Sequence, residues 1–228
     1  MLLLTLVSCF IAVAQCCDIP PDFWCDSPES AERCHVQAQC ANYKKSFMKP
    51  IKVTFIYESL CPYCQNYIAR NLADLYGRHR SLIELEMVPW GNAVVNQDGS
   101  FTCNHGEKEC ESNRLQSCVL EVVKMKHSVP FIICFENALH TLDVNQALTH
   151  CSSTINHALP AIRACFDGPR GIELQRQAAA RTEATRPYRI SEVPYILIND
   201  YSPQPPANTV NIIALKNLLY KWAKEVRR

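Results

Sequence analysis

The sequence predicts an α/β fold, and three observations support this prediction. First, residues 51–57 alternate as a strand does, a helical pattern follows, and residues 82–88 again have a strand pattern. Second, the long middle of the chain, from about 92 to 190, has mainly helical spacing. Third, the last part of the chain has a strand pattern that begins at a proline, and an amphipathic helical pattern follows it. Strands that alternate with helices are typical of layered α/β proteins.

The length and composition are those of one medium-sized domain with small attachments. The chain has 228 residues, of which 48% are hydrophobic, so a substantial core can form. The formal net charge is +1 and no basic stripe is present, which argues against nucleic acid as a partner. No later run is long and apolar enough to cross a bilayer, so we expect no membrane span.

The N-terminus, MLLLTLVSCFIAVAQ, has the pattern of a secretory signal. Its apolar run is too short to span a membrane, and Ala12-Val13-Ala14 suits signal peptidase. We expect residues 1–14 to be removed and the protein to enter the secretory pathway, where cysteines usually pair. Loss of Cys9 leaves thirteen of the fourteen cysteines, an odd number.

Residues 16–42 form a cysteine-dense segment that is too small for a large core. The expected structure is a module tied by disulfides among Cys17, Cys25, Cys34 and Cys40. The spacing resembles a saposin A-type segment, which implies an origin among lysosome-directed or secreted precursors. The resemblance leaves open whether this segment binds lipid. Cys16 is then left over, and is either trimmed, free or used to link two copies; the oligomeric state is not predicted.

The first strand and the helix after it flank the motif CPYC. In IKVTFIY (51–57) alternate residues are apolar, as on one face of a strand. The helix has apolar residues at three- and four-residue spacing from Ile68 to Tyr76, and Gly77 is predicted to end it. The predicted order is therefore strand, CPYC, helix and strand.

The CPYC motif predicts a redox pair. Pro62 suits the first helical position, which makes Cys61 the N-cap, beside unpaired backbone N–H groups and the positive end of the helix dipole. Both favour a thiolate at Cys61, and Cys64 lies three residues further on, within reach. We therefore expect Cys61 to attack a substrate disulfide and Cys64 to resolve the mixed disulfide.

Two other roles for this pair are less well supported. A zinc site usually needs a second matched pair, and the chain has no other CxxC. A purely structural link would close a very small loop and remove little entropy from the unfolded chain. We expect no metal and no cofactor, with a small-molecule thiol as the reductant that regenerates the pair.

Later elements follow from the same patterns. Helices are predicted at 113–127, 154–166 and 172–186, and the charges of the last indicate a solvent-exposed helix. SEVPYILIND (191–200) is predicted to be a strand that Pro194 introduces. The apolar stripe from Leu215 to Val226 predicts a C-terminal helix that packs on the core.

A second motif, CNHGEKECESNRLQSC, covers residues 103–118. It predicts a turn at 104–106 and then a helix, with its three cysteines in disulfides. Six cysteines in the middle of the chain allow 15 connectivities, and none is assigned. The open alternative is a zinc site formed by Cys103, His105, Cys110 and Cys118.

This motif closely resembles the signature C-Q-H-G-x2-E-C-x2-N-x4-C of the gamma-interferon-inducible lysosomal thiol reductase (GILT) family. Asn104 stands where the family has Gln, CPYC matches the family's CxxC, and VPWGNA (88–93) is similar to a third family stretch. The resemblance covers roughly residues 50–228. The matching positions of the signature are Cys103, His105, Gly106, Glu109, Cys110, Asn113 and Cys118.

The resemblance implies a thioredoxin-like fold with a helical insertion at about 92–190 and disulfide staples. It implies that Cys61 and Cys64 reduce disulfides of unfolded protein substrates in acidic endosomes or lysosomes, which aids unfolding and proteolysis. Thioredoxin-like folds place a cis-proline opposite the CxxC. The resemblance therefore implies a cis bond between Val193 and Pro194, where these residues hold the substrate backbone. The signature residues are given structural roles only.

Acidic surroundings make a low pKa at Cys61 important. A thiol with a pKa of about 8.5 is only about 0.03% thiolate near pH 5, whereas a pKa of about 5 makes it half thiolate. The helix N-terminus is expected to supply much of this lowering. Glu58 either opposes the thiolate or is a plain surface residue.

Two alternative functions remain at this point. The same dithiol chemistry would serve a thiol oxidase or isomerase that acts outside the cell or in the endoplasmic reticulum. A non-enzymatic disulfide-rich binding protein, with a lipid site at residues 17–40, would instead retain its function in a Cys61→Ser variant.

Overall fold

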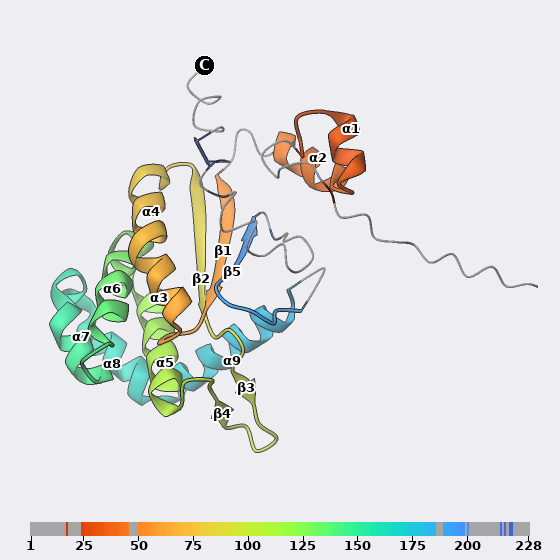
Figure 1. Ribbon diagram of the computed structural model, residues 1–228. Coiled ribbons are helices and arrows are strands. Elements are labelled where there is room, and N and C mark those ends of the chain that lie inside the picture. The colour runs from red at the N-terminus through yellow and green to blue at the C-terminus, as the bar shows by residue number, and fades with distance from the viewer. Residues whose placement is uncertain are drawn as a thin grey trace, which may run out of the picture.

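The computed structural model describes residues 17, 24–45, 50–185, 189–198, 200, 215, 217, 219 and 220 (Figure 1). The expected signal at 1–14, the leftover Cys16 and most of the expected C-terminal helix lie outside these residues. Leu215 and Leu219 are described, and both are buried in the main core as the stripe predicts. No described helix combines the length and apolar character that crossing a bilayer requires.

A three-stranded sheet organises the molecule, with β1 (Ile51–Tyr57) between its two neighbours (Figure 1). β2 (Ile83–Pro89) pairs with β1 in parallel, and β5 (Tyr195–Ile198) pairs with it antiparallel. The predicted strands are present, but β1 is buried on both faces. Phe55 belongs to one core cluster and Ile56 to the other, because the strand is central and both faces of the sheet are covered.

One continuous helical segment begins within CPYC, at Pro62. It consists of α3 (Pro62–Tyr67), a π-helical turn, η3 (Ile68–Leu72), and α4 (Ala73–His79). The predicted end at Gly77 is wrong, since the helix runs on to His79. A glycine in a helix costs only about 1 kcal/mol, and burial of Leu75 and His79 on either side of it offsets that cost.

Between β2 and β5 the chain is mainly helical. The helices are α5 (Glu107–Val122), α6 (Met125–Ala138), α7 (Val144–Cys151), η4 (Ser152–Thr154), η5 (Asn156–Ala158), α8 (Leu159–Asp167) and α9 (Pro169–Glu183). A small hairpin of β3 (Val94–Val95) and β4 (Phe101–Thr102) precedes them.

The helix predicted to be solvent-exposed, α9, has one buried face. Ala178 and Ala179 pack into the core cluster that contains Ile56, and Gln175 is buried with its Nε2 donating to the Cys110 carbonyl oxygen at 3.0 Å. The small alanine side chains let the helix approach the sheet closely. The prediction of an exposed helix came from the charged residues on the other face of α9.

The described disulfides divide the cysteines into separate groups. Cys17–Cys34 and Cys25–Cys40 tie the N-terminal segment, where α1 (Pro28–Arg33) and α2 (Gln37–Lys45) enclose a small core of their own. The middle of the chain holds three more. These are Cys103–Cys110, Cys118–Cys165 and Cys134–Cys151. The alternative zinc site is therefore wrong, since its three cysteines are oxidised in two different disulfides.

Candidate active site

Cys61 and Cys64 are the only described cysteines outside a disulfide. Cys61 is the N-cap of α3, with φ −65° and ψ 118°, and Pro62 occupies the first turn, as the sequence predicts. Cys61 is 5% exposed and Cys64 is fully buried. Of the two sulfur atoms, the one at the helix N-cap is therefore the one that a substrate can reach.

The two thiols have opposite electrostatic surroundings. A hydrogen bond from the Cys64 thiol is the largest cause that lowers the pKa of Cys61, to about 7, against the effect of partial burial. The backbone N–H groups of Cys64 and Tyr63 lower it further, as a helix N-terminus should, while the charge of Glu58 raises it. Burial, followed by the Cys61 interaction, raises the pKa of Cys64 strongly. The pair therefore has one thiol that ionises readily and one that stays protonated.

The Val193–Pro194 peptide bond is cis, as the resemblance implied. Tyr195 is in register with Ile56, so Pro194 lies at the end of β1 that leads into the CPYC loop. Pro194 is buried, and Val193 is half-buried against the core cluster that includes Cys61 and Cys64. The structure thus brings all four predicted site residues to one end of the sheet.

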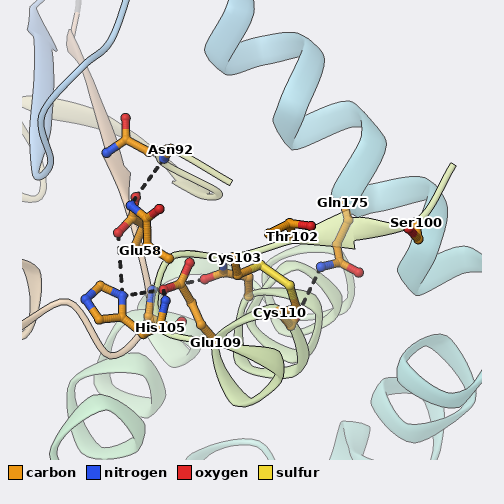
Figure 2. The surroundings of a disulfide bond; sticks show 12 residues. Glu58, Asn92, Ser100, Thr102, Cys103, His105, Glu109, Cys110 and Gln175 are labelled. Atoms are coloured by element: carbon orange, nitrogen blue, oxygen red, sulfur yellow. Dashed lines mark hydrogen bonds and ion pairs between the residues drawn. A yellow bond between two sulfur atoms is a disulfide. The ribbon is translucent and has the colours of Figure 1, made fainter. Parts of the chain in front are cut away.

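Glu58, three residues before Cys61, is buried rather than on the surface. It is 1% exposed, and its Oε1 accepts hydrogen bonds from the Asn92 backbone N–H at 2.7 Å and from Asn104 Nδ2 at 3.2 Å (Figure 2). Gly91 makes this possible, because a Cβ there would lie 2.4 Å from Glu58 Cγ. Of the two roles considered for Glu58, the surface one is wrong.

His105 and Glu109 lie beside Glu58 (Figure 2). Glu109 is fully buried, accepts a hydrogen bond from the His105 backbone N–H at 2.9 Å, and also contacts Nδ1 of the ring. The same Nδ1 lies 3.7 Å from Glu58 Oε2. Burial raises the pKa of Glu109, the His105 contact lowers it and the nearby Glu58 charge raises it again.

Two groups of described side chains have the spacing of metal ligands. One is Cys134, His150 and Cys151, whose two cysteines are joined in a disulfide, and the other is Glu58, His105 and Glu109. Their ligand atoms all lie within 4.8 Å of one another.

Gly106, with φ +82°, turns the chain between His105 and the start of α5. A left-handed backbone of this kind favours glycine, which explains one more signature position.

A buried polar network supports the CPYC loop from the insertion side. Glu136 of α6 accepts hydrogen bonds from Gln116 Nε2 at 2.6 Å and from Gln65 Nε2 at 3.1 Å, and Gln65 is the residue after CPYC. Tyr57, at the end of β1, donates to Gln116 Oε1 at 2.6 Å. Burial raises the pKa of Glu136. The signature residue Asn113 accepts a hydrogen bond from the Ser59 backbone N–H at 3.0 Å.

The sequence predicts, as one of two roles, that Glu58 opposes the thiolate, which the structure supports. Sequence reasoning misses the burial of Glu58 and the roles of Glu136 and Asn113. One signal in the sequence could have indicated these roles. The two stretches that resemble the family, 88–93 and 103–118, lie outside the CxxC and contain polar residues. Both stretches supply contacts to the loop at 58–60.

Comparison with known proteins finds relatives of one family. Residues 52–155 match the family model of gamma interferon inducible lysosomal thiol reductase (GILT). The gamma-interferon-inducible lysosomal thiol reductase of Carassius auratus is 33% identical over 86% of this chain and 76% of its own length. The protein of the same name from Mus musculus is 29% identical, over 72% of this chain and 66% of its own.

The fold has its own independent match. A crystal structure of the oxidoreductase DsbA from Xylella fastidiosa superposes with a TM-score of 0.51 over 77% of this chain and 87% of that chain, at 15% sequence identity. This likeness confirms the thioredoxin-like fold. The family is shown by the relative from Carassius auratus, with the family model in agreement: the chain belongs to the gamma-interferon-inducible lysosomal thiol reductase family of thiol-disulfide oxidoreductases.

Proposed function

We propose that this protein reduces disulfide bonds of polypeptide substrates, with Cys61 as the attacking thiolate and Cys64 as the resolving thiol. The observation that carries the proposal is the asymmetry of the pair. The Cys61 thiol has a pKa lowered to about 7, and burial keeps Cys64 protonated until it is needed. A lowered pKa increases the fraction of Cys61 that is thiolate, the form that attacks a disulfide.

The reaction has two exchange steps. The Cys61 thiolate attacks one sulfur of the substrate disulfide, a mixed disulfide forms, and the other substrate sulfur leaves as a thiolate that takes up a proton. Cys64 then loses its proton and attacks Cys61 Sγ, which releases the second substrate thiol and leaves a Cys61–Cys64 disulfide. Two electrons pass to the substrate. Two molecules of a small thiol then reduce the Cys61–Cys64 disulfide by exchange and are themselves oxidised to a disulfide, which restores the dithiol.

The surroundings of Cys61 suit an extended, unfolded segment. Tyr63, inside the CPYC motif, is 76% exposed and offers an aromatic surface next to the reacting sulfur. Pro194 and Val193 lie at the same end of the sheet, where they contact the substrate backbone. Because Cys61 itself is only 5% exposed, a disulfide fixed inside a folded protein has poor access to it.

The proposed setting is an acidic endosome or lysosome, or the extracellular space. The relatives from Carassius auratus and Mus musculus carry the word lysosomal in their names. The five described disulfides, which are typical of proteins of the secretory pathway, also support it. In such a compartment, reduction of disulfides aids unfolding and proteolysis.

A reduction assay tests the proposal directly. A disulfide-bonded, denatured protein is offered at about pH 5 and pH 7 with a small thiol as the reductant. Cys61→Ser should abolish turnover, and Cys64→Ser should accumulate a mixed disulfide that links Cys61 to the substrate. The control is the double variant Cys134→Ser/Cys151→Ser, which removes one structural disulfide but leaves CPYC intact and should remain active. Full activity of Cys61→Ser would disprove the proposal.

A further inference from the structure

The short loop between β1 and the redox helix, residues 58–60, has an unusual backbone conformation. Leu60, immediately before Cys61, has φ +67°, in the left-handed region that leucine rarely adopts. For a residue with a Cβ this conformation is disfavoured about tenfold in population relative to the ordinary ones. Such a backbone persists only where surrounding contacts determine it, and it is typical of functional sites. The contacts of this loop therefore indicate what holds Cys61 in place.

Two helices of the insertion supply those contacts. Asn113 Oδ1, on α5, accepts a hydrogen bond from the buried Ser59 backbone N–H at 3.0 Å. Glu136 Oε2, on α6, accepts one from the Leu60 backbone N–H at 3.5 Å. The Ser59 hydroxyl in turn accepts from Gln116 Nε2 at 2.5 Å. Both backbone N–H groups that lead into the left-handed residue are thus held by side chains of the insertion.

Asn113 makes the shorter of these two backbone contacts, and its burial is costly. The side chain is fully buried, and its Nδ2 has no hydrogen-bond partner among the described residues. A buried amide nitrogen without a partner lowers the stability of a protein. A leucine of similar size would avoid this penalty. The part of the Asn113 side chain that the site uses is therefore the oxygen that accepts from Ser59.

We propose that Asn113 is a positioning residue for the reductase, which holds the left-handed backbone of Leu60 so that Cys61 stays at the helix N-cap. This inference rests on the proposed function of Cys61 as the attacking thiol, and it deepens that function. Asn113 acts on the thiol through the backbone of the loop. The helical insertion thereby takes part in presenting the nucleophile.

The geometry of the N-cap explains how this contact affects the thiol. Cys61 has φ −65° and ψ 118°, the extended backbone of an N-cap, and the N–H groups of Cys64 and Tyr63 stabilise its thiolate. If Leu60 relaxes to a negative φ, the chain enters Cys61 from another direction. The sulfur then moves away from these donors, and a smaller fraction of it is in the thiolate form that attacks a disulfide.

A double-mutant cycle on the full-length chain tests the proposal. The rate at which iodoacetamide alkylates Cys61 is measured from pH 5 to 9, on protein with a reduced CPYC and intact structural disulfides. Peptide fragmentation identifies the alkylated cysteine. The variants are Asn113→Ala, Leu60→Gly and the double variant. Ser112→Ala is the matched control, because Ser112 is fully buried on the same helix and its hydroxyl has no hydrogen-bond partner among the described residues.

Asn113→Ala should slow alkylation at pH 7 by about threefold or more and move the pH profile of the rate towards higher pH, because Cys61 leaves the N-cap donors. A merely structural loss would lower the unfolding midpoint without moving this profile. In the Leu60→Gly background the same change should alter the rate by less than about twofold, because glycine adopts the left-handed backbone without strain. Ser112→Ala should match the wild type.

A second pair of variants decides the question if Asn113→Ala does not fold. Leu60→Val keeps an apolar side chain, but a β-branched residue tolerates positive φ poorly. Leu60→Asn loses the apolar side chain, but asparagine enters the left-handed region readily. Alkylation at pH 7 should therefore be at least about threefold slower in Leu60→Val than in Leu60→Asn. Equal rates, or a slower rate in Leu60→Asn, contradict the proposal.

Two results of the cycle would also overturn it. One is an Asn113→Ala variant that is alkylated as fast as the wild type at pH 7. The other is an equally large loss of rate with leucine and with glycine at position 60, which would assign the effect to general destabilisation. Alkylation needs no substrate disulfide, so failure of the proposed function, which the Cys61→Ser reductase assay detects, is distinguished from failure of this inference.

Discussion

Cys61 and Cys64 occupy adjacent turns of one helix start, yet their sulfurs differ in ionisation because one stands at the N-cap and the other is fully buried. The Cys64 thiol contributes most to the lowered pKa of its partner. Cys64→Ala should therefore raise the pKa of Cys61 above 7, since the side-chain donor is lost, whereas Cys64→Ser keeps a hydroxyl donor and should raise it less. The pH dependence of Cys61 alkylation measures both, and identical values in the two variants would contradict the assignment.

Gly91 and Gly99 provide a matched pair at the same scale. Both have positive φ, +63° and +83°, so alanine is strained at either site. Only at Gly91 would the new Cβ overlap a side chain, that of Glu58, while at Gly99 the nearest atom is 3.6 Å away. Gly91→Ala should destabilise the protein by at least about 1 kcal/mol more than Gly99→Ala. Denaturant unfolding measures the difference, and equal losses would show that Glu58 moves aside freely.

At the scale of elements, α6 carries a carboxylate that anchors the start of the redox helix. Glu136→Ala would leave the buried amides of Gln65 and Gln116 without their acceptor and should cost at least about 2 kcal/mol. Glu173→Ala on the exposed face of α9 is the control and should cost less than about 0.5 kcal/mol. Denaturant unfolding measures both losses of stability. A loss for Glu136→Ala no larger than that for Glu173→Ala would show that the network does not stabilise the site.

The same carboxylate should make stability depend on pH in an unusual direction. Burial raises the pKa of Glu136 in the folded state, so between the unfolded and the folded pKa the folded protein binds more protons. Stability contributed at this site therefore increases as the pH falls through the folded pKa. Relative to Glu136→Gln, the wild type should gain stability from pH 7 towards pH 5. Unfolding curves at both pH values measure this, and a constant difference would contradict it.

Local patterns predicted the elements whose contacts are local. The alternation of IKVTFIY gave β1 with its observed limits, and Pro62 gave the N-cap at Cys61. Patterns failed where tertiary contacts decide: the helix continues through Gly77 because its neighbours are buried, and α9 buries a polar Gln175. Glu58 and Glu136 belong to the second class. Their hydrogen-bond partners lie 20 to 76 residues away, so no local spacing indicates that these charges are buried.

At the scale of the whole molecule, the disulfides of the middle segment differ in the length of chain they close. Cys118–Cys165 spans 47 residues and joins α5 to α8, whereas Cys103–Cys110 spans 7. By loop entropy, replacing the first pair with alanines should cost about 4 kcal/mol and the second about 2.5 kcal/mol. Thermal or denaturant unfolding of the two double variants gives the order. A larger loss of stability for the Cys103–Cys110 variant would show that this disulfide also maintains tertiary contacts, beyond the entropy of its loop.

The N-terminal segment closes both of its bonds, Cys17–Cys34 and Cys25–Cys40, within itself. None of the described disulfides joins residues 17–45 to residues 50–220. A protease that cuts one peptide bond between 45 and 50 would therefore release this segment as a separate, internally crosslinked peptide, with no described sulfur bridge to retain it. In terms of maturation, residues 17–45 could be removed from the chain without breaking any of the disulfides described in residues 50–220.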